Sequence, residues 1–275
     1  MDRYPELIEN LAKGHVIPFI GAGLPMSLGL PSYRQLIREL GENLNFDADI
    51  FERLGDYLSL AEYYYHQKGG LLELQRHLQK NWKRTRQEII ASPAYKAIVE
   101  LGCKTIYTTN FDGHLEQAHR ALKVRYRTIR SAKDLVNLDN GKTHIFKLHG
   151  DITSPSTMVF TETSYFERMS FEHPLDIKLR GDVLGKSILF IGYSLSDINI
   201  RYLLFRLQKQ WDAEPDHRIR PKSYVFLGRP NAVQEDVLRR RGIEPIIAES
   251  TDQTGALAEF LQNLRAAADS LRSPA

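Results

Sequence analysis

Short apolar runs alternate along the chain with longer amphipathic stretches. The apolar runs have the length of buried strands, and the stretches between them carry apolar residues at helical spacing. The predicted strands span residues 15–20, 104–108, 124–129, 144–148, 187–191, 223–227 and 243–247. Strands that alternate with helices are typical of βαβ units, and strands this apolar are buried on both faces. The expected fold class is therefore α/β, with a Rossmann-like, doubly wound and mostly parallel sheet.

The same pattern predicts where the helices lie. They are expected at residues 7–11, 35–44, 94–101, 113–121, 175–184 and 197–211, with a closing helix around 257–264. From about residue 45 to 92, Leu, Tyr, Gln, Arg and Lys recur at helical spacing, and no strand pattern interrupts them. We therefore expect one domain over residues 1–275, with a helical insertion or small subdomain at about 45–92.

Composition narrows the class of protein. The chain has 275 residues, 42% hydrophobic and 26% charged, and a net charge of +3, so direct nucleic-acid binding is not expected. The basic run 239–241 precedes Gly242 and suits a helix C-terminus. One cysteine, Cys103, excludes an internal disulfide and a four-cysteine zinc site. The absence of a signal peptide or membrane-spanning run predicts a reduced, cytoplasmic protein with no membrane contact.

Several predicted strands end in glycine or polar residues. In an open α/β sheet the carboxyl ends of the strands face the ligand crevice. The first strand is followed by a small-residue loop that suits phosphate, because backbone N–H groups can approach it closely. The residues at these strand ends are Gly21, Ala22, Gly23, Thr109, Asn110, Asp112, His149, Gly192, Ser194 and Gly228, with Asp197 just beyond Ser194. Together they predict one ligand crevice.

Each of these signals also has a structural interpretation. The glycine loop has the composition of a tight turn, and its spacing is not G-x-G-x-x-G. Asn110, Asp112 and Asp197 suit the capping of the helices that follow them. His149 suits either a core histidine or a general base, and His144 is the weaker base candidate because it lies at the opposite end of the same strand.

Four segments, in the same order, resemble the sirtuin family. Gly21-Ala22-Gly23 with residues 29–34 resembles the sirtuin pattern G-A-G-x-S-x-x-x-G-I-P-D-F-R, with the same spacing. Residues 108–112 resemble T-Q-N-I-D, residues 149–150 match H-G, and residues 192–195 resemble G-T-S-L. The resemblance covers residues 15–200 and implies a Rossmann-like fold that binds NAD.

The departures from the sirtuin pattern are informative. Pro25 stands where sirtuins carry Ser, and Ser32 stands where they carry Asp. Sirtuin deacylases carry a four-cysteine zinc module between the H-G and G-T-S motifs, and this chain has no cysteine there, so no zinc is expected. The segment after Asp151 also lacks a clear acyl-lysine groove. With Gly192-Tyr193-Ser194-Leu195-Ser196-Asp197, the chain is similar to a bacterial sirtuin-like branch of NAD-cleaving effectors in antiphage defence.

The resemblance implies a role for each candidate residue, with NAD as the substrate. Asn110 would position water or the ribose hydroxyls, His149 would act as general base, and Asp112 would orient the nicotinamide carboxamide. The residues implied in NAD binding are Gly21, Ala22 and Gly23 at the pyrophosphate, Arg34 at phosphate or ribose, and Thr109, Gly192, Ser194, Asp197 and Gly228. The implied products are nicotinamide and ADP-ribose, and hydrolysis is not separated from cyclisation of ADP-ribose.

An unregulated NAD hydrolase is toxic to its host, so we expect its activity to be gated. The expected gates are a homo-oligomer formed through the helical insertion, or a partner protein such as an ATPase, a translocase or another defence sensor.

Three other functions are open at this point. A protein-lysine deacylase needs an acyl-peptide groove, an NAD or ADP-ribose sensor needs no base, and a Rossmann dehydrogenase needs an acidic residue about 20 positions after the glycine loop.

Overall fold

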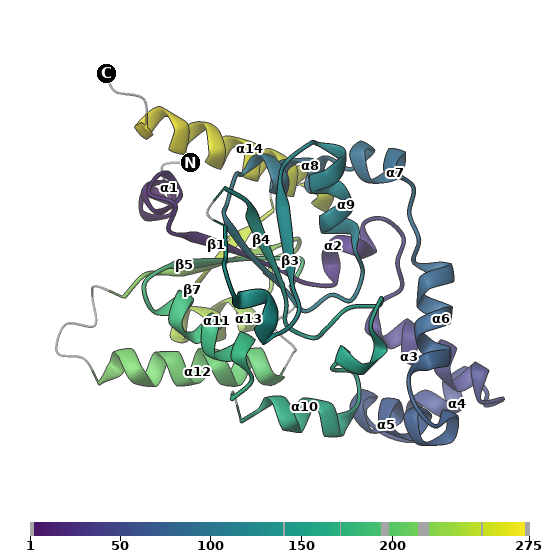
Figure 1. Ribbon diagram of the computed structural model, residues 1–275. Coiled ribbons are helices and arrows are strands. Elements are labelled where there is room, and N and C mark those ends of the chain that lie inside the picture. The colour runs from purple at the N-terminus through teal and green to yellow at the C-terminus, as the bar shows by residue number, and fades with distance from the viewer. Residues whose placement is uncertain are drawn as a thin grey trace.

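A seven-stranded parallel sheet forms the centre of the protein in a computed structural model (Figure 1). The structure describes residues 3–139, 141–170, 172–193, 198–213, 220–248 and 250–272. The strands are β1 (Val16–Ile20), β2 (Thr105–Thr108), β3 (Tyr126–Ile129), β4 (Thr143–Lys147), β5 (Ser187–Ile191), β6 (Ser223–Leu227) and β7 (Ile243–Ile247). Their order across the sheet is β3-β4-β2-β1-β5-β6-β7. The predicted α/β class is confirmed.

The strands are apolar because both faces of the sheet are covered. Along β1, Ile17 and Phe19 enter one hydrophobic cluster, whereas Val16 and Ile20 enter the cluster on the opposite face. This alternation follows from the period of two in a strand. Each strand therefore contributes to two cores, which explains why the sequence shows continuous apolar runs rather than alternating polar positions.

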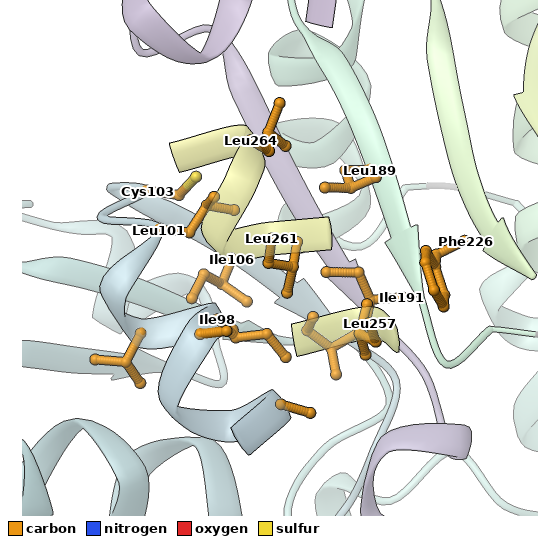
Figure 2. Packing of buried hydrophobic residues seen from close by; sticks show 14 of the residues in the cluster. Ile98, Leu101, Cys103, Ile106, Leu189, Ile191, Phe226, Leu257, Leu261 and Leu264 are labelled. Atoms are coloured by element: carbon orange, nitrogen blue, oxygen red, sulfur yellow. The ribbon is translucent and has the colours of Figure 1, made fainter. Parts of the chain in front are cut away.

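Helices form a layer on each face of the sheet (Figure 1). The first face carries α1 (Pro5–Ala12), α8 (Pro93–Glu100), α9 (His114–Ala121) and α14 (Gln253–Arg272). The opposite face carries α11 (Pro174–Leu184), α12 (Ile198–Asp212) and α13 (Ala232–Arg240). Figure 2 shows the first core, in which Leu257, Leu261 and Leu264 of α14 lie among side chains from the sheet and from α8.

A separate group of helices lies beside one end of the sheet. It contains α3 (Tyr33–Asn43), α4 (Ala48–Arg53), α5 (Tyr57–Lys68) and α6 (Leu72–Asn81), and α7 (Arg86–Ala91) leads back to α8. This group has its own hydrophobic core, which also takes in Phe111 and Phe160. The helices predicted for residues 45–92 are present. Because α3 shares their core, the exact bounds of a subdomain stay a prediction.

The helix starts follow local sequence signals where a cap is available. Ser32 caps α3 and forms a capping box with Gln35. The predicted cap Asp197 of α12 lies outside the described residues.

Two helices were not predicted, α2 (Gly23–Met26) and α10 (Glu162–Arg168), and both are short. None of the described helices combines the length and apolar character needed to cross a bilayer.

The strand order creates a topological switch point beside β1. From β1 the chain first builds β2, β3 and β4 on one side, and then returns to place β5 on the other side. The residues at the carboxyl edge are in register, since Ile20 pairs with both Thr108 and Ile191, and Thr108 pairs with Lys147. Ligands of open α/β sheets bind at such a switch point, so the loops that follow these four residues define the candidate site.

Candidate active site

The glycine loop after β1 packs tightly against the loop after β5. The Gly21 N–H donates to the Ile191 carbonyl at 2.9 Å, and the Gly23 N–H donates to the Gly192 carbonyl at 2.7 Å. A Cβ atom on Gly21 would lie 2.3 Å from Cδ2 of Tyr193 and 2.5 Å from the Gly192 oxygen. Gly192 itself has φ +62°, which favours glycine. The glycines are therefore required by the contact between these two loops.

Because of this packing, not every backbone N–H group of the glycine loop is available to bind a phosphate. Because Gly21 and Gly23 donate within the protein, their N–H groups are already used. Ala22, between them, is exposed, and its N–H has no acceptor among the described residues. The loop thus presents the Ala22 backbone at the switch point, while its two glycines fix its position.

Asn110 is bound to the glycine loop through its side chain. The Nδ2 atom of Asn110 donates to the Gly21 carbonyl at 3.0 Å. Thr108 stabilises the same turn, because its hydroxyl donates to the Ile20 carbonyl at 2.9 Å and accepts from the Asn110 N–H at 3.0 Å. The Oδ1 atom of Asn110 has no donor in the part of the chain that the structure describes. The side chain is half-buried, so this oxygen can accept a hydrogen bond from a ligand.

Asp112 accepts a hydrogen bond from the start of α9 through one carboxylate oxygen and keeps the other oxygen uncommitted. Its Oδ1 atom accepts from the His114 N–H at 3.0 Å and lies 3.2 Å from Nδ1 of the same residue. Its Oδ2 atom is buried and has no hydrogen-bond donor among the described residues. The N-cap of α9 is Gly113, without a side-chain cap, so Asp112 contacts the helix start from one residue before the cap. A ligand contact of the uncommitted Oδ2 stays a prediction.

His149 lies at the start of the loop after β4, at the position that corresponds to Asn110 after β2. Thr108 of β2 pairs with Lys147 of β4. Asn110 lies two positions after Thr108, and His149 lies two positions after Lys147. His149 is 4% exposed. Its ring meets the Tyr165 ring of α10 edge to face, with the centroids 5.1 Å apart. The following Gly150 has φ +82°, and a Cβ there would lie 2.0 Å from the Thr157 oxygen, so the histidine loop also needs its glycine.

An ionic cluster, buried except at Arg130, lies beneath these loops, and its residues were not among those predicted for the site. We call Lys147, Glu116, Arg130 and Asp151 the Lys147 cluster. The Lys147 side chain is 0% exposed, with Nζ 3.4 Å from Asp151 Oδ2 and 3.8 Å from Glu116 Oε1. Arg130 Nε donates to Asp151 Oδ2 at 3.1 Å. A lysine within an apolar strand pattern was the sequence signal that could have revealed it.

The charges of the cluster keep Asp151 ionised. Burial raises the pKa of Asp151, but Lys147, Thr153 and Arg130 together lower it further, so the pKa of this carboxyl lies below its ordinary value. An ionised Asp151 can balance the buried Lys147 ammonium. Paired burial of this kind is what allows charged side chains to lie in a protein interior.

The remaining predicted residues are placed as follows. Arg34 lies on α3 and its guanidinium pairs with Glu52 of α4, with Nε 2.5 Å from Oε1. Thr109 is half-buried beside Asn110. Gly228 packs against the start of α14, since a Cβ there would lie 2.4 Å from Cδ of Gln253. Ser194 and Asp197 lie outside the described residues. The described residues contain no group of three or more His, Cys, Asp or Glu side chains placed to hold a metal ion.

The parallel sheet, its two helical layers and the switch point beside β1 define an open, doubly wound α/β protein. A protein-family comparison matches residues 104–246 to the SIR2-like domain, which is more than half of the chain. The chain therefore belongs to the SIR2-like family. The matched range contains Asn110, Asp112, His149 and Gly192, and it begins after the glycine loop.

Curated relatives cover a similar part of the chain. The protein is 28% identical over 204 residues to the NAD(+) hydrolase ThsA of Acinetobacter baumannii (strain 532279), a match that covers 74% of this chain and 41% of the relative. It is 30% identical over 208 residues to the NAD(+) hydrolase ThsA of Enterococcus faecium, with coverage of 74% and 41%. Defense-associated sirtuin 2 of Bacillus subtilis is 25% identical over 221 residues, which are 74% of this chain and 20% of that protein. The chain thus spans well under half the length of these relatives.

A solved structure supports the fold. The crystal structure of a complex of a Sir2 homologue with NAD aligns with a TM-score of 0.52, 98% of this chain and 94% of that chain being covered. The sequence identity is 13%, so this match concerns the fold alone.

Proposed function

We propose that this protein is an NAD hydrolase that cleaves NAD to nicotinamide and ADP-ribose. The observation that carries the proposal is the hydrogen bond of 3.0 Å from Asn110 Nδ2 to the Gly21 carbonyl. It joins the loop that suits phosphate to the residue that suits the ribose, at the topological switch point. The names of the ThsA relatives, NAD(+) hydrolases, support the same substrate.

The reaction breaks the bond between ribose C1′ and the nicotinamide nitrogen. The electron pair of this bond goes to nicotinamide, which leaves as a neutral molecule, while positive charge builds on the ribose. Polar oxygens held in place before the reaction stabilise such a charge, and the free Oδ1 of Asn110 suits this role or that of a water acceptor. Water then adds to C1′ and loses a proton to His149, a general-base contribution of about 10²–10⁴-fold.

The other residues bind and orient NAD. Ala22 meets the pyrophosphate, and the Oδ2 atom of Asp112 accepts from the nicotinamide carboxamide. Arg34 reaches a phosphate or the ribose by exchanging its partner Glu52 for the ligand. The binding surface also takes in Thr109, Gly192 and Gly228. Ser194 and Asp197 stay candidates from the sequence resemblance. NAD is the substrate, and this mechanism uses no zinc.

We also propose that the activity is gated as part of bacterial antiphage defence. The name of the Bacillus subtilis relative, Defense-associated sirtuin 2, supports a defence role. The gate is a homo-oligomer formed through the helical insertion at about residues 45–92 (α4–α7), or a partner protein such as an ATPase, a translocase or another sensor. A constitutively active monomer in size-exclusion chromatography would refute the gate and leave the hydrolase intact.

The decisive experiment uses the purified chain and NAD. The products are separated by chromatography against nicotinamide, ADP-ribose and cyclic ADP-ribose standards, with and without the proteins encoded next to it. We expect equimolar nicotinamide and ADP-ribose. Cyclic ADP-ribose as the main product would replace hydrolysis by cyclisation, and unchanged NAD in every condition would refute the enzyme.

A further inference from the structure

Lys147 touches both of the loops that carry the candidate catalytic groups. Its Nζ atom donates to the Phe111 carbonyl at 3.1 Å and to the Asp112 carbonyl. The same atom lies 3.4 Å from Asp151 in the loop that begins at His149. A single buried ammonium therefore bridges the residues that follow Asn110 and the residues that follow His149.

Backbone contacts join the same two loops. The Leu148 N–H donates to the Thr108 carbonyl at 2.9 Å, and the Ile152 N–H donates to the Phe111 carbonyl at 3.1 Å. The Phe111 oxygen thus accepts both from Lys147 and from Ile152. Since the Lys147 side chain is fully buried, its hydrogen bonds are not exchanged with water and are stronger than they would be at the surface.

We propose that Lys147 is a positioning residue that sets the relative placement of Asn110 and His149. This inference rests on the proposed NAD cleavage. Lys147 acts through the carbonyls of Phe111 and Asp112 and through Asp151, and it does not touch the substrate. A displacement of about 1 Å in a catalytic group costs on the order of 10²-fold in rate, so loss of this bridge lowers kcat with little effect on KM.

The test needs a variant that removes the bridge without leaving uncompensated buried charge. Lys147→Gln alone leaves the buried Glu116 carboxylate without its cation and leaves Asp151 with Arg130 alone, so it endangers folding. The double substitution Lys147→Gln with Glu116→Gln removes one charge of each sign. Glu116→Gln alone is the matched control, because it keeps the Lys147 contacts to both carbonyls.

Two readouts separate positioning from general stability. We expect the double variant to lower kcat by about 10- to 100-fold, with KM within about threefold of the control. Amide hydrogen exchange in residues 108–113 and 149–152 is expected to be at least about tenfold faster, with exchange in β5 unchanged. The Glu116→Gln control is expected to match the wild type in both its kinetic constants and its hydrogen exchange. A double variant that matches the control in kcat and exchange overturns the proposal.

If the double variant does not fold, a measurement on the wild-type protein tests whether Lys147 holds the two loops. In a ¹⁵N-lysine NMR spectrum, a Lys147 ammonium bound to two carbonyls gives a slowly exchanging signal at neutral pH. A rapidly exchanging Lys147 signal overturns the proposal. If wild-type protein leaves NAD intact, the proposed function fails, whereas the exchange data on the loops still decide whether Lys147 holds them together.

Discussion

Asn110 and Gly21 are 89 positions apart in the chain, yet the Asn110 side-chain amide donates to the Gly21 carbonyl at 3.0 Å. Their strands, β1 and β2, are neighbours in the sheet. One amide group is thereby fixed against the loop expected to hold phosphate, while its oxygen stays available to a ligand.

Replacing Asn110 by Ala is expected to lower kcat for NAD cleavage by about 100- to 1000-fold, the range found when one stabilising group is removed from a transition state. The matched control is Asn10→Ala. Asn10 Nδ2 also makes a half-buried hydrogen bond, to Ser187 Oγ at 2.8 Å, but this bond lies at the opposite end of the sheet. Both variants lose about 1 kcal/mol of stability. Equal activity of the two variants would contradict the assigned role of Asn110.

The two histidines of β4 and its loop provide a second matched pair. His149 and His144 are 4% and 7% exposed, and they lie at opposite ends of the strand. His149→Gln is expected to lower the rate of NAD cleavage by about 10²–10⁴-fold because the general base is lost. His144→Gln is expected to keep the wild-type rate. Steady-state kinetics on both folded variants checks this, and full turnover by His149→Gln would remove His149 from the mechanism.

Two glycines are expected to respond oppositely to the same change. Gly21→Ala places a Cβ 2.3 Å from Tyr193, and such overpacking lowers the free energy of unfolding by about 1–3 kcal/mol. It also displaces the loop at Ala22, so NAD affinity falls. Gly181→Ala lies in α11, where a Cβ meets nothing within 4 Å. It is expected to raise stability by about 0.5–1 kcal/mol. Chemical denaturation and NAD titration measure both effects.

The buried His119 makes stability depend on pH. Burial lowers the pKa of its imidazole, against the smaller raising effect of its hydrogen bond to the Leu115 carbonyl. Since the folded-state pKa is depressed, the unfolded chain binds a proton first as pH falls. His119 therefore contributes stability above a pH of about 6.5, and this contribution is lost as pH falls through the folded-state pKa.

His119→Asn removes this titration and retains an amide that can donate to the Leu115 carbonyl. Denaturant unfolding of both proteins between pH 7.5 and 5 is the measurement, with this range chosen about the ordinary histidine pKa. The stability of the wild type is expected to fall more steeply than that of the variant. Parallel curves for the two proteins would show that His119 makes no such contribution.

The local pattern was enough to predict the strands and most of the helices. The predicted strands at 187–191, 223–227 and 243–247 have the bounds found in the structure. Continuous apolar runs of this length are typical of strands in a sheet covered on both faces, so they indicate strands well. The short helices α2 and α10 were not predicted, because a few residues carry too little periodicity to indicate a helix.

The sequence by itself determined the covered parallel sheet and the residue types at its carboxyl edge. Burial and helix capping depend on residues that are close together in the chain, so local patterns indicate them. The tertiary structure alone decided which of these residues meet. It placed β2 between β1 and β4. It directed the N–H groups of Gly21 and Gly23 to carbonyls at the end of β5 and in the loop after it, and it placed Lys147 in contact with Phe111 and Asp112. These contacts join segments far apart in the chain, and strand order, which no local pattern encodes, brings them together.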